Sequence, residues 1–147
     1  MGRAPQNVLD LFAGTGALGL EALSRGAERA VFVEASPQTL KVLDQNVESF
    51  ARAKQTQILR EADVKKWKKN LLDRSEFLPF ELIFCDPPYG KGWIPKTFAA
   101  LDEPTLWSAD ALLIAEMSPQ ESISLERWRT IKEKVHGDSK VVFFARL

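Results

Sequence analysis

The stretch that decides the fold is NVLDLFAGTGALGLEALSRG, residues 7–26. It opens with an apolar, strand-like run at 7–12, and the glycine-rich AGTG follows directly. Residues 17–26 are then predicted to form a helix that closes on Gly26, a residue suited to the left-handed position after a helix end. A strand, a glycine turn and a helix in this order predict a β–α unit, the building block of parallel sheets.

The same alternation of apolar runs and helix-period segments continues along the chain. Further strands are predicted at 30–34, 56–60, 80–85 and 111–117, and further helices at 36–50, 63–74 and 94–107. Ser36 fits an N-cap, and Pro37 fits the first helical position. The tail 128–147 holds two strand-like segments around HGDS, which suits a turn. The pattern predicts one α/β domain over 1–147, with a mostly parallel sheet and a C-terminal antiparallel hairpin.

Composition excludes several classes of protein. Of the 147 residues, 45% are hydrophobic, which suffices for a packed core. The net charge is zero, so there is no global basic field, although a local patch could still meet RNA. Cys85 is the single cysteine, which rules out an internal disulfide and a multi-cysteine metal site, so we expect a buried thiol. With no signal-peptide pattern and no apolar run of about 18 residues, a soluble cytoplasmic protein without membrane contact is expected.

The glycines at the end of the first strand predict a cofactor site. Gly14, Gly16 and Gly19 fit G-x-G-x-x-G between a strand and a helix, which is the context that this motif requires. Glu34 closes the next strand, and its position suits hydrogen bonds from both hydroxyls of a ribose. We therefore expect a cofactor that contains a nucleoside. The alternative is a glycine turn that only packs a strand against a helix, with Glu34 in solvent.

Two carboxylates bear on which cofactor binds. Asp10 at the first strand's end would repel a pyrophosphate, whereas it suits the ammonium and sulfonium of S-adenosylmethionine. Asp10 could instead, or in addition, brace the loop by accepting its N–H groups. Asp63 follows the third strand, where it could accept a bond from the adenine amine or cap the helix that follows. One carboxylate could do both.

Asp86-Pro87-Pro88-Tyr89-Gly90 follows the apolar strand FELIFC and reaches the same edge of the sheet. Two prolines fix φ and remove two backbone donors, so the turn offers acceptors: the Asp86 carboxylate and the Pro87 carbonyl. Acceptors suit an amine that carries hydrogens, and Tyr89 offers a face on which a flat ring can stack. This pattern predicts methylation of an exocyclic amine on a base, without a metal. The alternative is a rigid exit turn with Tyr89 packed on the core.

On these residues the sequence resembles a known family. VLDLFAGTGALGLEALSRGA, VFVE, FCDPPYGKG and HGDSKVVFF are similar to segments of the bacterial guanine-N2 methyltransferases of 16S ribosomal RNA. The resemblance covers nearly all of 7–146 and implies the Rossmann-like, seven-stranded class I methyltransferase sheet. It also implies S-adenosylmethionine as cofactor and ribosomal RNA or the small ribosomal subunit as partner. We expect a monomer.

The resemblance also assigns site residues. It implies that the target base lies at Asp86, Pro87, Pro88 and Tyr89. It implies a cofactor pocket made by Asp10, Phe12, Ala13, Gly14, Thr15, Gly16, Glu34, Ala35, Asp63, Val64 and Asp86.

RNA contacts are less clearly marked. Family members usually carry a basic segment before the first strand, whereas only MGRAPQ precedes it here, so we expect weaker RNA affinity. Lys91 suits a phosphate contact, and Trp93 suits either a lid over the target base or the first core residue of a helix. KKWKK at 65–69 is expected to be a solvated helix face with Trp67 turned inward, rather than a phosphate contact. His136 is expected at the surface.

Other functions use parts of the same pattern. The Asp-Pro-Pro-Tyr element also occurs in enzymes that methylate adenine or cytosine in DNA or glutamine in proteins. A nicotinamide oxidoreductase would use the glycine motif and Glu34, but it leaves Asp10 and the Asp86 turn unexplained. A cofactor-binding regulator without catalysis is the alternative outside the enzymes.

Overall fold

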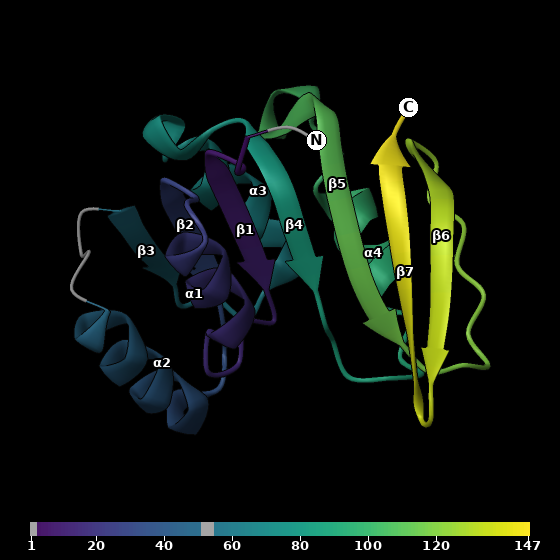
Figure 1. The fold of residues 1–147 in the computed structure, drawn as a ribbon, viewed down its shortest axis with the longest axis horizontal. Helices are drawn as coiled ribbons and strands as arrows, with labels where there is room; N and C mark the ends of the chain where they lie inside the picture. Colours follow the sequence, from purple (N-terminus) through teal and green to yellow (C-terminus); the bar gives the residue numbers. More distant parts are fainter. Residues whose placement is uncertain (1–2, 51–54) are drawn as a thin grey trace.

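The protein is described by a computed structural model for residues 3–50 and 55–147. A single seven-stranded sheet runs through it in the order β3-β2-β1-β4-β5-β7-β6 (Figure 1). β1 to β5 pair in parallel, and β7 is antiparallel to both β5 and β6. The predicted sheet and hairpin are therefore confirmed. The strands are β1 Asn7–Leu11, β2 Arg29–Val33, β3 Thr56–Leu59, β4 Phe80–Cys85, β5 Trp107–Met117, β6 Trp128–His136 and β7 Ser139–Arg146.

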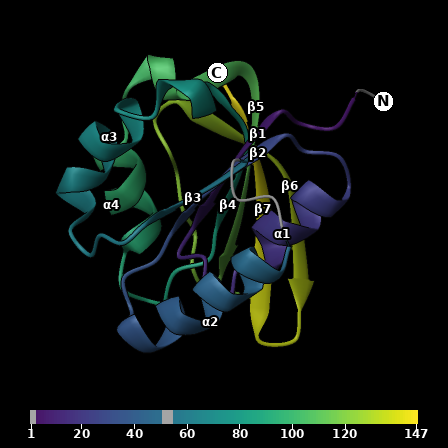
Figure 2. The same ribbon diagram turned by 90° about the vertical axis from the view of Figure 1, so that its left-hand side faces the viewer.

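α-Helices of the described residues cover both faces of the sheet, as Figure 2 shows. On one face lie α1 Ala17–Ser24 and α2 Pro37–Ser49, and on the other lie α3 Val64–Leu72 and α4 Trp93–Ala100. The predicted cap of α2 is confirmed, since Ser36 Oγ accepts the Thr39 N–H at 3.5 Å and Pro37 follows it. No helix in the part of the chain that the structure describes is long and apolar enough to cross a membrane.

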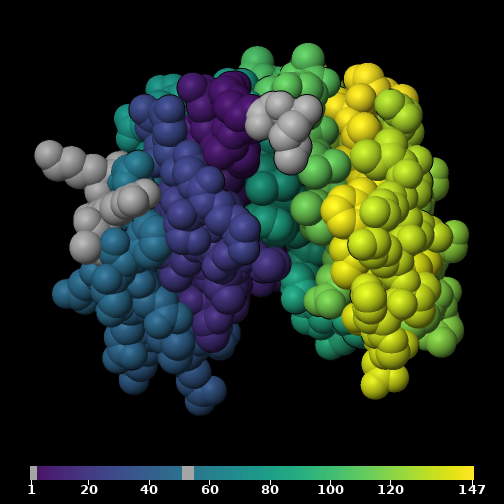
Figure 3. All heavy atoms as spheres, viewed as in Figure 1, coloured from purple at the N-terminus to yellow at the C-terminus, as the bar shows by residue number. Residues whose placement is uncertain are grey.

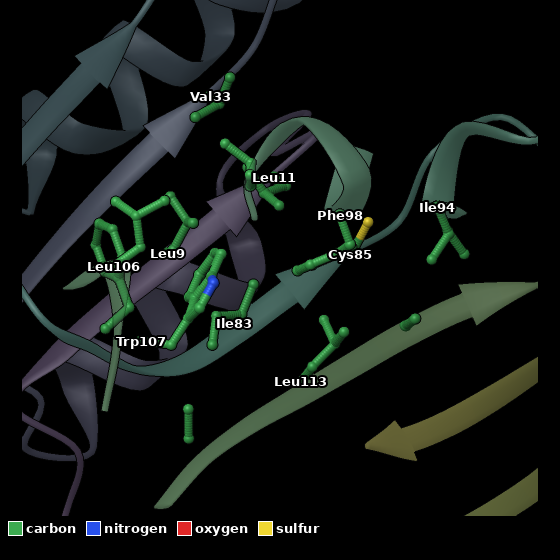
Figure 4. Packing of buried hydrophobic residues seen from close by; sticks show 14 of the residues in the cluster. Leu9, Leu11, Val33, Ile83, Cys85, Ile94, Phe98, Leu106, Trp107 and Leu113 are labelled. Atoms are coloured by element: carbon green, nitrogen blue, oxygen red, sulfur yellow. The ribbon is translucent and has the colours of Figure 1, made fainter. Parts of the chain in front are cut away.

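The two faces of the sheet bury separate apolar clusters because side chains alternate along a strand. On β1, Leu9 and Leu11 belong to the cluster beneath α3 and α4, part of which Figure 4 shows. Val8 belongs to the cluster beneath α1 and α2. Cys85 on β4 lies in the first cluster, and burial raises the pKa of its thiol, so it is the buried packing residue that the sequence predicted.

The helix predicted at 94–107 is wrong in its second half. α4 ends at Ala100, a short 3₁₀ turn follows at Pro104–Leu106, and β5 begins at Trp107. Glu103 stabilises the turn because its carboxylate accepts the Thr105 N–H at 3.2 Å. Leu106 and Trp107 had apolar spacing compatible with a helix, but Trp107 instead pairs with Phe80 of β4. Tertiary packing therefore overrides the local pattern here.

Candidate active site

The predicted site residues follow three neighbouring parallel strands at one edge of the sheet. The glycine loop (residues 12–16) follows β1, Glu34 follows β2, and the hook (residues 86–90) follows β4. Because β1 lies between β2 and β4, both Glu34 and the hook flank the glycine loop. This is the edge at which parallel α/β sheets bind ligands.

The glycine loop leaves β1 through a strained backbone. Phe12 has φ 57°, a left-handed value that costs a residue with a side chain on the order of 1 kcal/mol or more. Gly14 and Gly16 follow with φ 60° and 84°. The loop is held from α2, where Asn46 Nδ2 donates to the Thr15 carbonyl at 2.8 Å. The turn places the Phe12 ring against the rings of Trp67 and Trp93.

The Glu34 carboxylate is not simply exposed to solvent, because both of its oxygens already accept backbone N–H groups. Its Oε1 accepts the Gly14 N–H at 2.8 Å, and its Oε2 accepts the N–H groups of Ala35 and Ser36, both at 2.9 Å. The carboxylate thus ties the end of β2 to the glycine loop. A carboxylate has about four acceptor positions, so the contact with a ribose stays a prediction that this arrangement permits.

Asp10 braces the start of α1. Its side chain is buried, with the residue 2% exposed, and Oδ2 accepts the Gly19 N–H at 3.0 Å. The pKa of Asp10 is raised to about 7, chiefly by burial; the bond from Gly19 opposes the rise, and the charges of Asp86 and Glu34 add to it. The bracing alternative is therefore present, and contact between Asp10 and a cofactor stays a prediction.

Gly19→Ala tests this brace. A Cβ at Gly19 would lie 2.4 Å from Phe32 Cε1 and 3.1 Å from Asp10 Oδ2, so α1 must shift. We expect a loss of about 2 kcal/mol in the free energy of unfolding. The matched control is Gly14→Ala, where no atom lies within 4 Å and only the positive φ is unfavourable, at about 1 kcal/mol. Urea unfolding measures both, and a smaller loss for Gly19→Ala than for Gly14→Ala would contradict the close packing.

An apolar cavity of ≈ 270 Å³ opens beside Glu34. Phe12 meets Trp67 and Trp93 edge to face, with ring centroids 5.4 and 5.9 Å apart. The aromatic and apolar walls of the cavity suit a flat ring, and the Glu34 carboxylate lies at the border of the cavity. The lining residues are Phe12, Val33, Glu34, Ala35, Ala62, Val64, Trp67, Pro88 and Trp93.

The cavity gathers only part of the predicted cofactor set. Phe12, Glu34, Ala35 and Val64 line it. The other predicted cofactor residues lie on the same edge without lining it, namely Asp10, Ala13, Gly14, Thr15, Gly16, Asp63 and Asp86.

Trp67 is a cavity residue that sequence reasoning did not assign. It is turned inward as predicted, is 3% exposed, and donates from Nε1 to the Glu61 carbonyl at 2.9 Å. Lys65, Lys66 and Lys69 around it are exposed, so the solvated helix face is confirmed. The apolar residues of α3 lie on one side of the helix, and this pattern in the sequence indicates that Trp67 is buried. Only the tertiary structure shows that Trp67 faces the cavity.

Asp63 caps α3, since its Oδ1 accepts the Lys65 N–H at 3.0 Å. The capping alternative is therefore present. A contact between Asp63 and an adenine amine stays a prediction, and the second carboxylate oxygen is available for it.

The hook is fixed to the loop after β5. The Gly90 N–H donates to Glu121 Oε1 at 3.1 Å, while Glu121 Oε2 accepts the Ser118 N–H at 2.7 Å. Pro87 is buried, whereas Tyr89 is 40% exposed and its hydroxyl bonds with the Ser139 side chain. The alternative in which Tyr89 packs on the core is therefore wrong, and its ring stands at the surface.

Asp86 lies beside Glu116 of β5, a residue that sequence reasoning missed. The pKa of Asp86 is raised to about 7, first by its partial removal from water and then by the hydrogen bond and the charge of the Glu116 carboxyl group. The signal was present in ALLIAEM, where alternation places Glu116 near the carboxyl end of a strand.

The remaining predicted residues have different surroundings. Lys91 is exposed, and its contact with RNA phosphate stays a prediction. Trp93 is the first residue of α4 and is half-buried against Phe12, so it belongs to the cavity wall, while its role as a lid over a base stays a prediction. His136 is exposed at the end of β6, which confirms the surface prediction.

Other hollows of the described residues lie away from the cavity and the hook, and two of them are lined largely by apolar residues. One of ≈ 210 Å³ lies between α1 and β4, on the face drawn in Figure 3, where Leu18 faces Leu82 and Phe84. The other, of ≈ 220 Å³, is lined by Phe98, Trp128 and their neighbours. Neither is lined by a residue of the glycine loop or the hook, so we build the site on the cavity beside Glu34.

The strand order and the site at this edge define the fold of the class I S-adenosylmethionine-dependent methyltransferases, as the sequence predicted. A conserved hypothetical protein from Streptococcus pyogenes superposes with a TM-score of 0.82 at 29% identity, covering 99% of this chain and 88% of that one. An RNA methyltransferase from Salinibacter ruber, solved with S-adenosylhomocysteine, has the same fold, with a TM-score of 0.64 at 14% identity, 96% of this chain and 80% of that one.

Residues 3–145 match the family described as Conserved hypothetical protein 95. Ribosomal RNA small subunit methyltransferase D from Buchnera aphidicola is 30% identical over 128 residues, which cover 86% of this chain and 64% of that protein. The chain therefore belongs to this family, that of ribosomal RNA small subunit methyltransferase D, and the resemblance is confirmed. It spans 64% and 57% of the length of the first two curated relatives that it matches.

Proposed function

We propose that this chain transfers a methyl group from S-adenosylmethionine to the exocyclic amine N2 of a guanine in small-subunit ribosomal RNA. The observation that carries the proposal is that the apolar cavity and the hook share a border. Pro88 lines the apolar cavity and is also the centre of the hook. A nucleoside in the cavity and a base at the hook would therefore be neighbours, which direct transfer requires.

The residues present fit the cofactor. The aromatic and apolar walls around Phe12 suit an adenine ring, and Glu34 has acceptor positions left for ribose hydroxyls. Asp10 lies at the end of the neighbouring strand β1, and the positive charge of the cofactor would favour the ionised form of its carboxyl group. The bound cofactor supplies an electrophilic methyl group, so the chain's own task is to bind and align.

The hook fits the acceptor amine. The Asp86 carboxylate and the Pro87 carbonyl can both accept N–H bonds and so orient the nitrogen lone pair toward the methyl group. They also stabilise the positive charge that develops on that nitrogen. The exposed ring of Tyr89 gives the base a surface for stacking. RNA as substrate is supported by the name of the Buchnera relative, and guanine N2 by the resemblance of the Asp86 turn.

The proposal is tested by transfer of a tritiated methyl group to four substrates in parallel: small ribosomal subunits, naked 16S ribosomal RNA, DNA and protein. We expect label in RNA and its recovery as N2-methylguanosine after nucleoside analysis. Label in adenine, cytosine or glutamine would overturn the substrate. Calorimetry with S-adenosylhomocysteine and with NAD tests the cofactor, and binding of NAD alone would overturn the reaction class.

A further inference from the structure

Asp86 and Glu116 are held side by side by the register of two strands. Cys85, the last residue of β4, is paired with Ala115 of β5, and the strands are parallel. The residues that come next along the chain are Asp86, the first residue of the hook, and Glu116 of β5. Cys85 and Ala115 face the buried cluster under α3 and α4. Glu116 therefore projects to the opposite face of the sheet, and the Asp86 carboxyl group lies within hydrogen-bonding reach of it.

Two carboxyl groups at this distance can hold one proton between them, because the protonated group donates a hydrogen bond to the ionised one. The carboxyl group of Asp10 on β1 also interacts with the charge of Asp86, so a further acid lies near the pair.

Within residues 3–50 and 55–147, no ion pair compensates for the charges of Asp86 and Glu116. Lys140 bonds with the Glu121 carbonyl and lies 3.9 Å from Glu133. Lys134 of β6 is in the same row as Glu116 but two strands away, at about 10 Å. That distance is about one Debye length at 0.1 M salt, so salt weakens the attraction of an exposed charge.

We propose that Glu116 is a further functional residue of this site, a positioning residue that shares a proton with Asp86, so that the pair takes up the proton that the methylated amine must lose. This inference rests on the proposed function. The amine nitrogen bonds to the methyl carbon as the carbon–sulfur bond breaks, and the sulfur keeps the electron pair. The nitrogen then carries a positive charge, and one N–H proton passes to Asp86. Glu116 shares that proton until water removes it, which restores the ionised pair.

The pair predicts a pH dependence. Because the pair accepts a proton only when it is ionised, the single-turnover rate should rise with pH through about 7, the pKa of Asp86. Glu116→Gln removes the second acid, so the pKa of Asp86 falls and the rise moves to lower pH by about one unit or more. The rate at high pH should fall roughly 3- to 10-fold, because Asp86 becomes a weaker base.

The test uses single-turnover methyl transfer to ribosomal RNA from about pH 5.5 to about 9. Glu48→Gln, on the exposed side of α2, is the matched control and should leave the profile unchanged. An unchanged profile in Glu116→Gln would overturn the inference while the proposed function stands.

A second measurement needs neither substrate nor activity. The carboxyl carbon of Asp86, observed by NMR, should titrate near pH 7 in the parent chain and at lower pH in Glu116→Gln. If the parent does not methylate RNA, the proposed function fails, and this titration still decides whether the two carboxyl groups share a proton. Equal titration in both chains would overturn the pair.

Discussion

Asp86→Ala is expected to lower methyl transfer to ribosomal RNA by roughly 100- to 1,000-fold, the cost of removing one charged group that stabilises a transition state. The carboxylate is the ionic acceptor of the hook, and no other side chain there replaces it. The Pro87 carbonyl would remain, so the loss should be large but not complete. Single-turnover transfer of a labelled methyl group measures the effect.

The same variant should keep its cofactor site. Asp86 does not line the cavity beside Glu34, so affinity for S-adenosylhomocysteine should change far less than the transfer rate. Removing one acid from the pair with Glu116 also removes repulsion at high pH, so the variant should unfold no more readily than the parent. Asp110→Ala, an exposed residue early in β5, is the matched control. Transfer by Asp86→Ala at the parental rate would show that the hook does not hold the amine.

Most of the fold could be predicted from periodicity, since strands with buried runs and helices with clear caps carry their own signals. The Ser36-Pro37 start of α2 and the alternation in β5 are such cases. The failure at 94–107 has a physical cause. The apolar residues Leu106 and Trp107 are compatible with a helix or with a strand. Trp107 is in a strand because it pairs with β4 and packs against Trp128 of β6.

The candidate site divides in the same way. Its backbone positions followed from motifs, because the ends of parallel strands share an edge whatever lies between them. Partners brought from other elements did not follow. Asn46 reaches Thr15 from α2, and Glu121 reaches Gly90 from the loop after β5, and neither spacing is fixed by a local motif. Glu116 is an intermediate case. The alternation of β5 predicts which face of the sheet it lies on, but only the strand order shows that it lies beside Asp86.

Glu34→Ala is expected to weaken binding of S-adenosylhomocysteine by roughly 100-fold or more, about 3 kcal/mol. Two losses combine in this number. The N–H groups of Gly14, Ala35 and Ser36 lose their acceptor, so the glycine loop is no longer held to β2. The proposed bonds from the ribose hydroxyls are lost as well. Calorimetry measures the affinity, and Glu48→Ala on exposed α2 is the matched control.

The two losses can be separated with the 2′-deoxy analogue of S-adenosylhomocysteine. If Glu34 binds the ribose, the missing hydroxyl should weaken binding to the parent chain but have little further effect in Glu34→Ala, because the acceptor is already gone. If Glu34 only braces the loop, the analogue should lose the same affinity in both chains, and the ribose contact would be refuted. The three backbone N–H groups already bound to this carboxylate make the comparison necessary, since loss of affinity in the variant alone fits either role.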